Sequence, residues 1–141
     1  MNIVEPYVSA GPFKFGASLN DIVSVLGPPV SQQSKKGDET VVRYEGIRAT
    51  ISSRGVLEVS FLPEVNVSLL GIDVFGNPEA FRKLCELDGA PKEFVGFIVL
   101  FKLGVAMTGF HDGDDAQKAL TVFEKGHWDQ FASELKDYAF L

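Results

Sequence analysis

The stretch Val8-Ser9-Ala10-Gly11-Pro12-Phe13-Lys14-Phe15-Gly16 is followed, about sixty residues on, by Val67-Ser68-Leu69-Leu70-Gly71-Ile72-Asp73-Val74-Phe75-Gly76. One inserted residue aligns the two stretches, and both end in Phe-Gly. Similarity at a fixed spacing indicates that a chain is built from repeated structural units. The sequence therefore predicts a tandem duplication, with copies at about residues 7–65 and 66–126.

A helix-start signal follows each Phe-Gly pair. Ser18 precedes Asp21 by three residues in the first copy, and Asn77-Pro78-Glu79 stands at the matching place in the second. These residues cap free backbone N–H groups, and Pro suits the first helical position because its missing donor would be unpaired there. Each helix should end at a Gly with Pro just beyond, in Gly27-Pro28-Pro29 and Gly89-Ala90-Pro91. We expect two short helices with one apolar stripe each, formed by Leu19, Ile22, Val23 and Leu26 and by Ala80, Phe81, Leu84 and Leu87.

Strand-like segments follow each predicted helix. Residues 41–50 parallel residues 98–108, and a glycine inside each segment marks a turn. A further strand follows at 56–62 in the first copy and at 119–123 in the second. We interpret the polar segment 31–38 as an exposed loop, because it shows no periodicity.

The segment after Gly126 stands outside the repeat. Trp128, Phe131, Leu135 and Tyr138 recur at helical spacing. This pattern predicts a closing helix over residues 127–140 that packs on an apolar edge of the sheet.

Taken together, these elements predict an α+β fold in a single compact domain, residues 1–141. A helix and an antiparallel meander have one apolar face to bury. Two copies side by side would form one continuous sheet with both helices on one face and a C-terminal helix at the end. The opposite face of the sheet would then be free.

Composition narrows the classes of function. The chain has 141 residues, a formal net charge of −6 at pH 7 and one cysteine. Nucleic-acid binding is disfavoured because it needs concentrated Lys and Arg. The longest apolar stretch, residues 94–105, is too short to span a membrane, and residues 1–6 do not read as a secretory signal. We therefore expect a cytoplasmic protein without nucleic acid or membrane partners.

Two short motifs carry a family resemblance. Phe13-Lys14-Phe15-Gly16-Ala17-Ser18 and Val25-Leu26-Gly27-Pro28-Pro29 resemble the repeats of the beta-lactamase-inhibitory-protein and small outer-membrane lipoprotein group. The resemblance implies a similar fold and a protein-binding style. The chain departs from the inhibitor because one cysteine cannot supply its disulfides. By size, charge and class it also looks like bacterial toxin-immunity proteins, which is an analogy and not a motif.

The search for chemistry yields one acidic cluster. Asp112, Asp114 and Asp115 surround Gly113 and are candidate ligands for a hard cation such as Ca²⁺, although a tight hairpin turn accounts for the same residues. His111 and His127 lack the close spacing of zinc ligands, and packing is the expected role of Cys85. No nucleophile or cofactor motif occurs, so we expect no catalytic residue and no cofactor.

Three hypotheses for function follow. The first is a non-enzymatic protein-binding module, such as an immunity or inhibitor protein, that presents the free sheet face to another protein. The second is a small-molecule or metal-binding protein or enzyme with a site between the repeats and His111, Asp112 and Asp114 at its mouth. The third is a homodimer formed by edge strands. The partner-binding candidates are Tyr44, Arg48, Glu58, Phe101 and Lys102.

Overall fold

The two predicted helices are present in the computed structural model, which describes residues 1–139. They are α1 (Leu19–Leu26) and α2 (Ala80–Asp88). Ser18 and Asp21 form a capping box before α1, in which each side chain accepts a hydrogen bond from the other residue's backbone N–H. The predicted cap of α2 is wrong: Asn77 Oδ1 accepts a hydrogen bond from the backbone N–H of Glu79, but the helix begins at Ala80, so Pro78 lies before it and no side chain caps its first turn. No helix in the described residues is long and apolar enough to cross a membrane.

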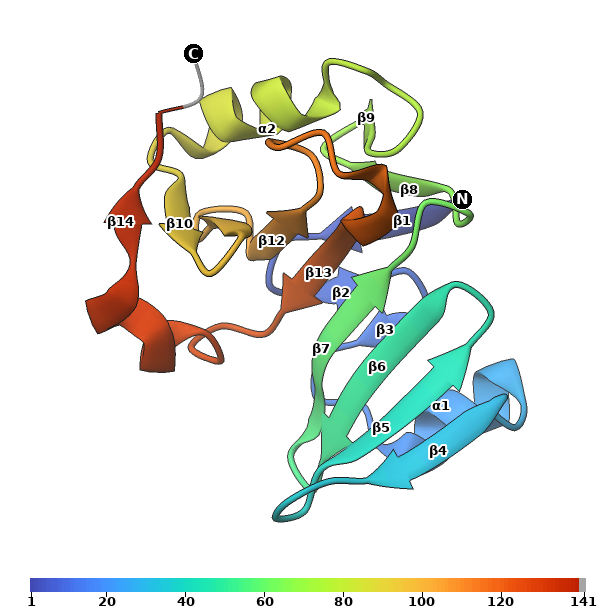
Figure 1. The fold of residues 1–141 in the computed structure, drawn as a ribbon. Helices are drawn as coiled ribbons and strands as arrows, with labels where there is room; N and C mark the ends of the chain where they lie inside the picture. The colour runs from blue at the N-terminus through green and yellow to red at the C-terminus, as the bar shows by residue number, and fades with distance from the viewer. Residues whose placement is uncertain (140–141) are drawn as a thin grey trace.

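Nine antiparallel strands form the large sheet (Figure 1). Their order across the sheet is β14-β10-β11-β12-β13-β7-β6-β5-β4. The strands that follow α1 are β4 (Ser31–Ser34), β5 (Thr40–Tyr44), β6 (Ile47–Ser52) and β7 (Gly55–Phe61). Those that follow α2 are β10 (Lys92–Phe94), β11 (Phe97–Leu100), β12 (Val105–Thr108), β13 (Ala119–Phe123) and β14 (Lys136–Asp137).

The pair β7·β13 lies at the centre of this sheet, with Ser60 opposite Thr121. On one side of the pair the strands are β6, β5 and β4, and on the other they are β12, β11 and β10. The two sets are thus mirrored in order about the central pair. Strands from both predicted copies lie in one sheet, while the duplication as such stays a prediction.

A second sheet of five short strands was not foreseen from the sequence. Its order is β3-β2-β1-β8-β9. β1 runs antiparallel to β2 and parallel to β8, so β2 and β8 run in opposite directions on either side of it. Elements of two to four residues are too short to show periodicity in a sequence. The bounds are Asn2–Glu5 for β1, Ser9–Ala10 for β2, Phe13–Lys14 for β3, Val67–Leu69 for β8 and Ile72–Asp73 for β9.

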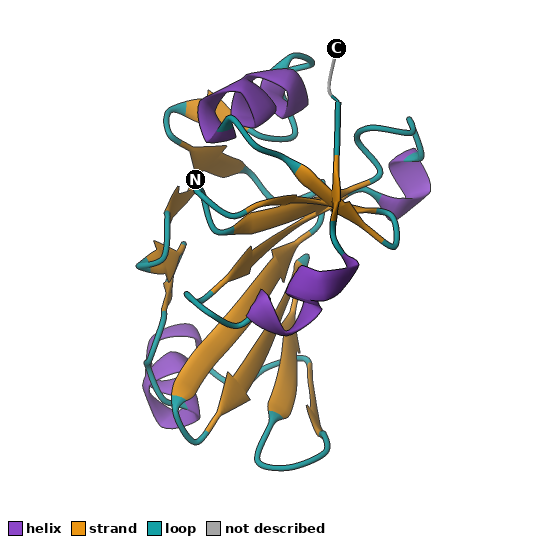
Figure 2. Ribbon diagram, turned by 90° about the vertical axis from the view of Figure 1, so that its left-hand side faces the viewer, coloured by secondary structure: helices purple, strands orange, loops and turns teal. Residues whose placement is uncertain are grey.

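The main core lies between the two sheets and the two helices. Ile22 of α1 and Leu84 of α2 belong to the same buried cluster as Phe13 of the small sheet and Phe61 of the large one. Figure 2 shows α1, α2 and the small sheet on the same side of the large sheet. The small sheet and the helices therefore form one layer over one face of the large sheet.

Residues 31–38 are not a loop throughout, which corrects the interpretation of the sequence. Ser31–Ser34 forms the edge strand β4, and it pairs with β5 through backbone hydrogen bonds. All four side chains of β4 are exposed. Because neither face of this strand is buried, its sequence has no apolar alternation to reveal it.

The predicted C-terminal helix over residues 127–140 is wrong within the described part of the chain, and residue 140 lies outside it. A 3₁₀ helix, η2 (Asp129–Glu134), is followed by β14, which pairs with β10 at the edge of the large sheet. Trp128 packs on the face away from the helices, whereas Tyr138 packs against Phe81 on the helix side. The segment passes around the sheet edge, so its aromatic residues never share one helical face.

The start of β7 runs very close to the segment that leads into α1. The backbone N–H of Val56 donates to the carbonyl of Ala17, and a Cβ atom at Gly55 would lie 2.2 Å from the carbonyl carbon of Gly16. Gly55 also has a φ of +102°, a conformation that residues with a side chain rarely adopt. A glycine is therefore required at this position.

We predict that Gly55→Ala lowers the free energy of unfolding by about 3 kcal/mol or more, because backbone strain adds to the overlap with Gly16. Urea unfolding followed by circular dichroism would measure the change. Gly37→Ala is the matched control, since Gly37 also has a positive φ but open space around its Cα. That control should cost about 1 kcal/mol. Equal losses in the two variants would contradict the close approach.

Candidate functional site

The face of the large sheet that points away from α1 and α2 is named here the open face. Side chains alternate between the two faces along each strand. The register places one row of cross-strand neighbours across this face, and its two halves differ in chemistry. In order, the row contains Arg43, Arg48, Ser60, Thr121, Ala106 and Val99.

Aromatic residues cover the half of the open face that belongs to the later strands. Val99, Ala106 and Phe123 are buried beneath Trp128, which is only 5% exposed, and Phe131 packs beside it. Trp128 Nε1 donates a 2.9 Å hydrogen bond to Glu58 Oε1. The chain after β13 thus closes this half of the face with an aromatic layer.

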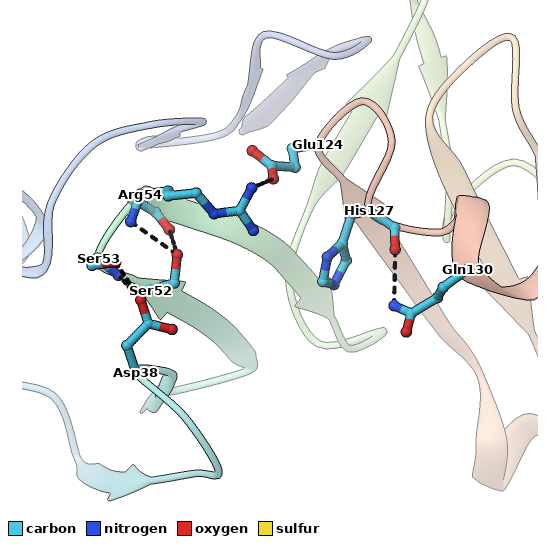
Figure 3. A network of polar contacts seen from close by, with 8 residues as sticks. Asp38, Ser52, Ser53, Arg54, Glu124, His127 and Gln130 are labelled. Atoms are coloured by element: carbon cyan, nitrogen blue, oxygen red, sulfur yellow. Dashed lines mark hydrogen bonds and ion pairs between the residues drawn. The ribbon is translucent and has the colours of Figure 1, made fainter.

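A network of polar contacts links the β6–β7 turn to the residues that follow β13 (Figure 3). Arg54, in the β6–β7 turn, lies 3.8 Å from the carboxylate of Glu124, just after β13. The hydroxyl and backbone N–H of Ser53 both donate to Asp38, and the hydroxyl hydrogen bond is the main reason that the pKa of Asp38 is lowered. The network ties the β6–β7 hairpin to the segment that carries Trp128.

Beside this layer no described segment covers the open face, and a groove of about 560 Å³ is formed there by residues from both halves of the sheet. The groove lies between the β5–β6 hairpin and the β10–β11 hairpin, with the central pair β7·β13 as its floor. Its lining residues are Arg43, Tyr44, Gly46, Ile47, Arg48, Ser60, Leu62, Val95, Gly96, Phe97, Thr108, Gly109, Asp112, Ala116, Gln117, Lys118, Ala119 and Thr121.

The wall formed by residues 109–118 is held in place by local contacts. The Thr108 hydroxyl donates a 2.8 Å hydrogen bond to the carbonyl of Gln117. Lys118 Nζ lies 5.0 Å from the centre of the Phe110 ring and 3.4 Å from a carboxylate oxygen of Asp115. The groove wall is thus preformed by contacts of its own residues.

Val95 lies at the tip of the β10–β11 hairpin, at the rim of the groove. Its φ is +46° and its side chain is 81% exposed. A β-branched residue is strained in this conformation, and Asn or Asp is the usual residue there in a two-residue hairpin turn. The protein therefore keeps an exposed apolar side chain at this rim at a cost in stability.

The charges in the groove are opposite in sign to the charge of the whole protein. Arg43, Arg48 and Lys118 line it together with one acidic residue, Asp112, although the chain carries a net charge of −6. Among the described residues, no ion pair or side-chain hydrogen bond engages either arginine. The groove therefore offers free cationic groups on an otherwise acidic molecule.

The predicted partner-binding residues do not lie on one surface. Arg48 is exposed in the groove. Glu58 is on the open face, but its carboxylate accepts the Trp128 hydrogen bond. Tyr44 borders the groove and turns its hydroxyl to the carbonyl of Gly27 on the helix side. Phe101 and Lys102 lie in the β11–β12 turn, where Phe101 packs against the aromatic layer. Arg48 alone among the five is a free group in the groove.

The three acidic residues of the candidate metal site make different contacts and do not point to one common site. Asp112 Oδ1 accepts a hydrogen bond from the backbone N–H of Asp114, as in a turn, and Asp115 is paired with Lys118. Of these three, Asp112 alone lines the groove, while His111 packs against Tyr138 on the other side. In the part of the chain that the structure describes, no three His, Cys, Asp or Glu side chains gather so as to hold a metal ion.

Cys85 is buried in the main core on α2. Burial, with a smaller contribution from the nearby carboxylate of Asp88, raises the pKa of its thiol to about 12. A thiolate is the reactive form of cysteine, so this thiol is unsuited to nucleophilic chemistry at neutral pH. Its observed role is packing, as the sequence predicts.

Three groove features were missed at the level of sequence: Arg43, the Ser60–Thr121 pair and Val95. Arg43 alternates with the inward-facing Val42 and Tyr44, which was a usable signal for an outward position. Ser60 Oγ and Thr121 Oγ1 lie 2.9 Å apart, yet they are far apart in the chain, so their pairing has no local signature. The strain at Val95 depends on the turn geometry.

We predict that Glu58→Ala lowers the free energy of unfolding by about 2 kcal/mol, because it leaves the buried Trp128 N–H without its partner. Trp128 is the only tryptophan in the chain, so its fluorescence should shift to longer wavelength. Thr50→Ala, at the residue paired with Glu58 on β6, is the control and should cost less than about 1 kcal/mol. An unchanged emission maximum in Glu58→Ala would contradict this anchoring role.

Comparison with known proteins adds no assignment to this geometry. No protein-family model, no curated protein and no solved structure matches the chain. The open face and its groove are therefore the basis for inferring a function.

Proposed function

We propose that this protein is a non-enzymatic binding module that holds a segment of a partner protein in the groove of the open face. The observation that carries the proposal is the combination of free cations with exposed apolar side chains in one concave surface. Arg43 and Arg48 supply the charge, and Val95 and Leu62, which are 81% and 44% exposed, supply apolar contact. Interfaces bury apolar anchors and use charged groups for specificity.

Charge complementarity decides the chemistry of the segment. The groove is cationic, so we propose an acidic segment that also carries an aliphatic or aromatic residue for the rim around Val95. A long polyanion such as nucleic acid suits the protein less well, because the chain outside the groove has an excess of carboxylates. A short acidic segment meets the arginines without extending over that acidic surface.

The lining residues support binding more than catalysis. They include no histidine and no cysteine. Two of the hydroxyls, those of Ser60 and Thr121, hydrogen-bond to each other across the central strand pair, so neither is poised against a general base. The groove therefore has the composition of a recognition surface.

The mirrored strand order supports our proposal that the frame arose by tandem duplication. Matching strands lie at matching distances from β7·β13, so Arg48 corresponds to Ala106 and Arg43 to Val99. The two halves thus share a frame and differ on the open face. One half keeps apolar residues under the aromatic layer, and the other carries arginines that no described segment covers.

A small anionic molecule is the second candidate ligand, and the size and place of the groove favour it. About 560 Å³ falls within the range of small-molecule sites, and the lining residues come from both halves of the large sheet. In this case the ligand would lie between the repeats.

The first experiment selects binders from a random linear peptide library displayed on phage, with the wild-type protein immobilised at low ionic strength. We expect recovery of acidic peptides that contain an apolar residue. Their affinity should fall at least about tenfold for Ala119→Trp, which fills the groove with a bulky side chain and leaves the charge unchanged. Val25→Trp makes a similar change on α1, at an exposed position on the other side of the large sheet, and should bind as the wild type does.

Two outcomes of this selection contradict the proposal: no enrichment of peptides, or equal binding to Ala119→Trp and the wild type. Thermal melts of both variants show that each is folded before binding is compared. A small acidic molecule that competes with the selected peptides would place the second candidate ligand in the same groove.

The strained turn gives a separate prediction. Val95→Asn should raise the free energy of unfolding by about 1 kcal/mol, because Asn accepts a positive φ more readily, and should weaken binding of the selected peptides. Leu70→Asn is the matched control: Leu70 also has a positive φ, at +52°, in the two-residue β8–β9 turn outside the groove. It should stabilise the protein and leave binding unchanged. Unchanged peptide binding by Val95→Asn would exclude a role of this side chain in recognition.

A further inference from the structure

We infer that Arg43 and Arg48 together form a subsite for an oxyanion, a carboxylate or a phosphate group, on the bound segment. The inference deepens the proposed function and rests on it for the identity of the ligand that carries this group. It assigns to one pair of side chains the recognition of a defined chemical group.

The backbone register fixes the arrangement of the pair. Arg43 on β5 and Arg48 on β6 are directly opposite each other, and both lie on the open face. Directly opposed residues on antiparallel strands have Cβ atoms about 5 Å apart. Two long guanidinium side chains that start so close together can reach one anionic group at the same time.

Two like charges in this position repel each other, and the fold does not neutralise them. Opposed like charges destabilise a sheet. In the described part of the chain, every ion pair involves other residues, and the cation–π contact found there belongs to Lys118. A bound anion would relieve this repulsion, so anion binding at the pair should be favourable.

The corresponding positions in the other half show that the frame does not require arginines here. There the residues are Val99 and Ala106, both buried under the aromatic layer. An apolar pair is therefore compatible with these strand positions. The arginines stand where the face is open, beside the hydroxyls of Ser60 and Thr121, which lie next along the same row.

The chemistry of guanidinium selects the ligand group. Its planar array of N–H donors matches the two oxygens of a carboxylate or phosphate, and such hydrogen bonds are about twice as strong as neutral ones. Two guanidinium groups match a group of two negative charges. The source on a peptide is then either two neighbouring acidic side chains or one phosphorylated side chain.

The test uses two probes on the full chain at low ionic strength: inorganic phosphate and the blocked dipeptide N-acetyl-Glu-Glu-amide. NMR detection of the arginine side-chain N–H groups follows the titration. We expect shifts at Arg43 and Arg48, and about tenfold weaker binding in Arg43→Gln and in Arg48→Gln. Arg82→Gln is the matched control, because Arg82 is exposed on α2 and pairs with Glu86 there. Its affinity should stay within about twofold of the wild type.

The two probes separate the sources of the oxyanion. Binding of the dipeptide that depends on both arginines supports acidic side chains, and binding of phosphate alone supports a phosphorylated side chain. Equal affinities in the wild type, Arg43→Gln and Arg48→Gln overturn the inference, and so does the absence of binding by both probes. Thermal melts without probe confirm that the glutamine variants are folded.

Failure of this inference is distinguishable from failure of the proposed function. Peptides recovered by phage selection that bind Arg43→Gln and Arg48→Gln as well as the wild type would contradict the oxyanion subsite and leave groove recognition in place. Phosphate binding that depends on the arginines, without any selected peptide, would contradict the protein-binding function and favour a small anionic ligand.

Discussion

The antiparallel pairing of β7 with β13 is the interaction on which the rest of the structure depends. It joins the strands that follow α1 to those that follow α2, and the Ser60 and Thr121 hydroxyls meet at its centre. Without this pair each half would expose an edge strand and half of an apolar face. With it, one large sheet can bury its inner face under both helices and the small sheet. The same pair forms the floor of the groove.

The two halves of the open face have the same frame but different covers. Over Val99 and Ala106, the chain after β13 lays down Trp128 and its aromatic neighbours, which bury apolar surface and are anchored through Glu58. The segment then passes around the sheet edge, where β14 pairs with β10. No described segment covers Arg43 on the other half. The groove beside it is cationic, in contrast to the acidic protein as a whole.

The candidate site could be predicted from the sequence only in part. The sequence makes Arg48 a candidate partner-binding residue but does not show which face of the sheet is exposed, and the structure places Arg48 in the groove. Glu58 was chosen by the same reasoning, yet its carboxylate is occupied by Trp128, a contact across 70 residues that local pattern does not contain. Val95 exposes its apolar side chain at the groove rim because of a strained turn, which the sequence does not reveal. Long-range pairing and turn geometry therefore decided which polar and apolar side chains are free.

The sequence by itself determined the elements with strong local signals: the capped helix α1, the helix α2, their glycine ends, and the strands with alternating apolar residues. These elements could be predicted because burial of one face spaces the apolar residues periodically and local capping places characteristic residues at the helix ends. Only the tertiary structure decided the small sheet, the edge strand β4, the course of the chain after Trp128 and the groove. These features arise from contacts between segments that are far apart in the chain. The free energy of such contacts cannot be predicted from the hydrophobic periodicity of either segment alone.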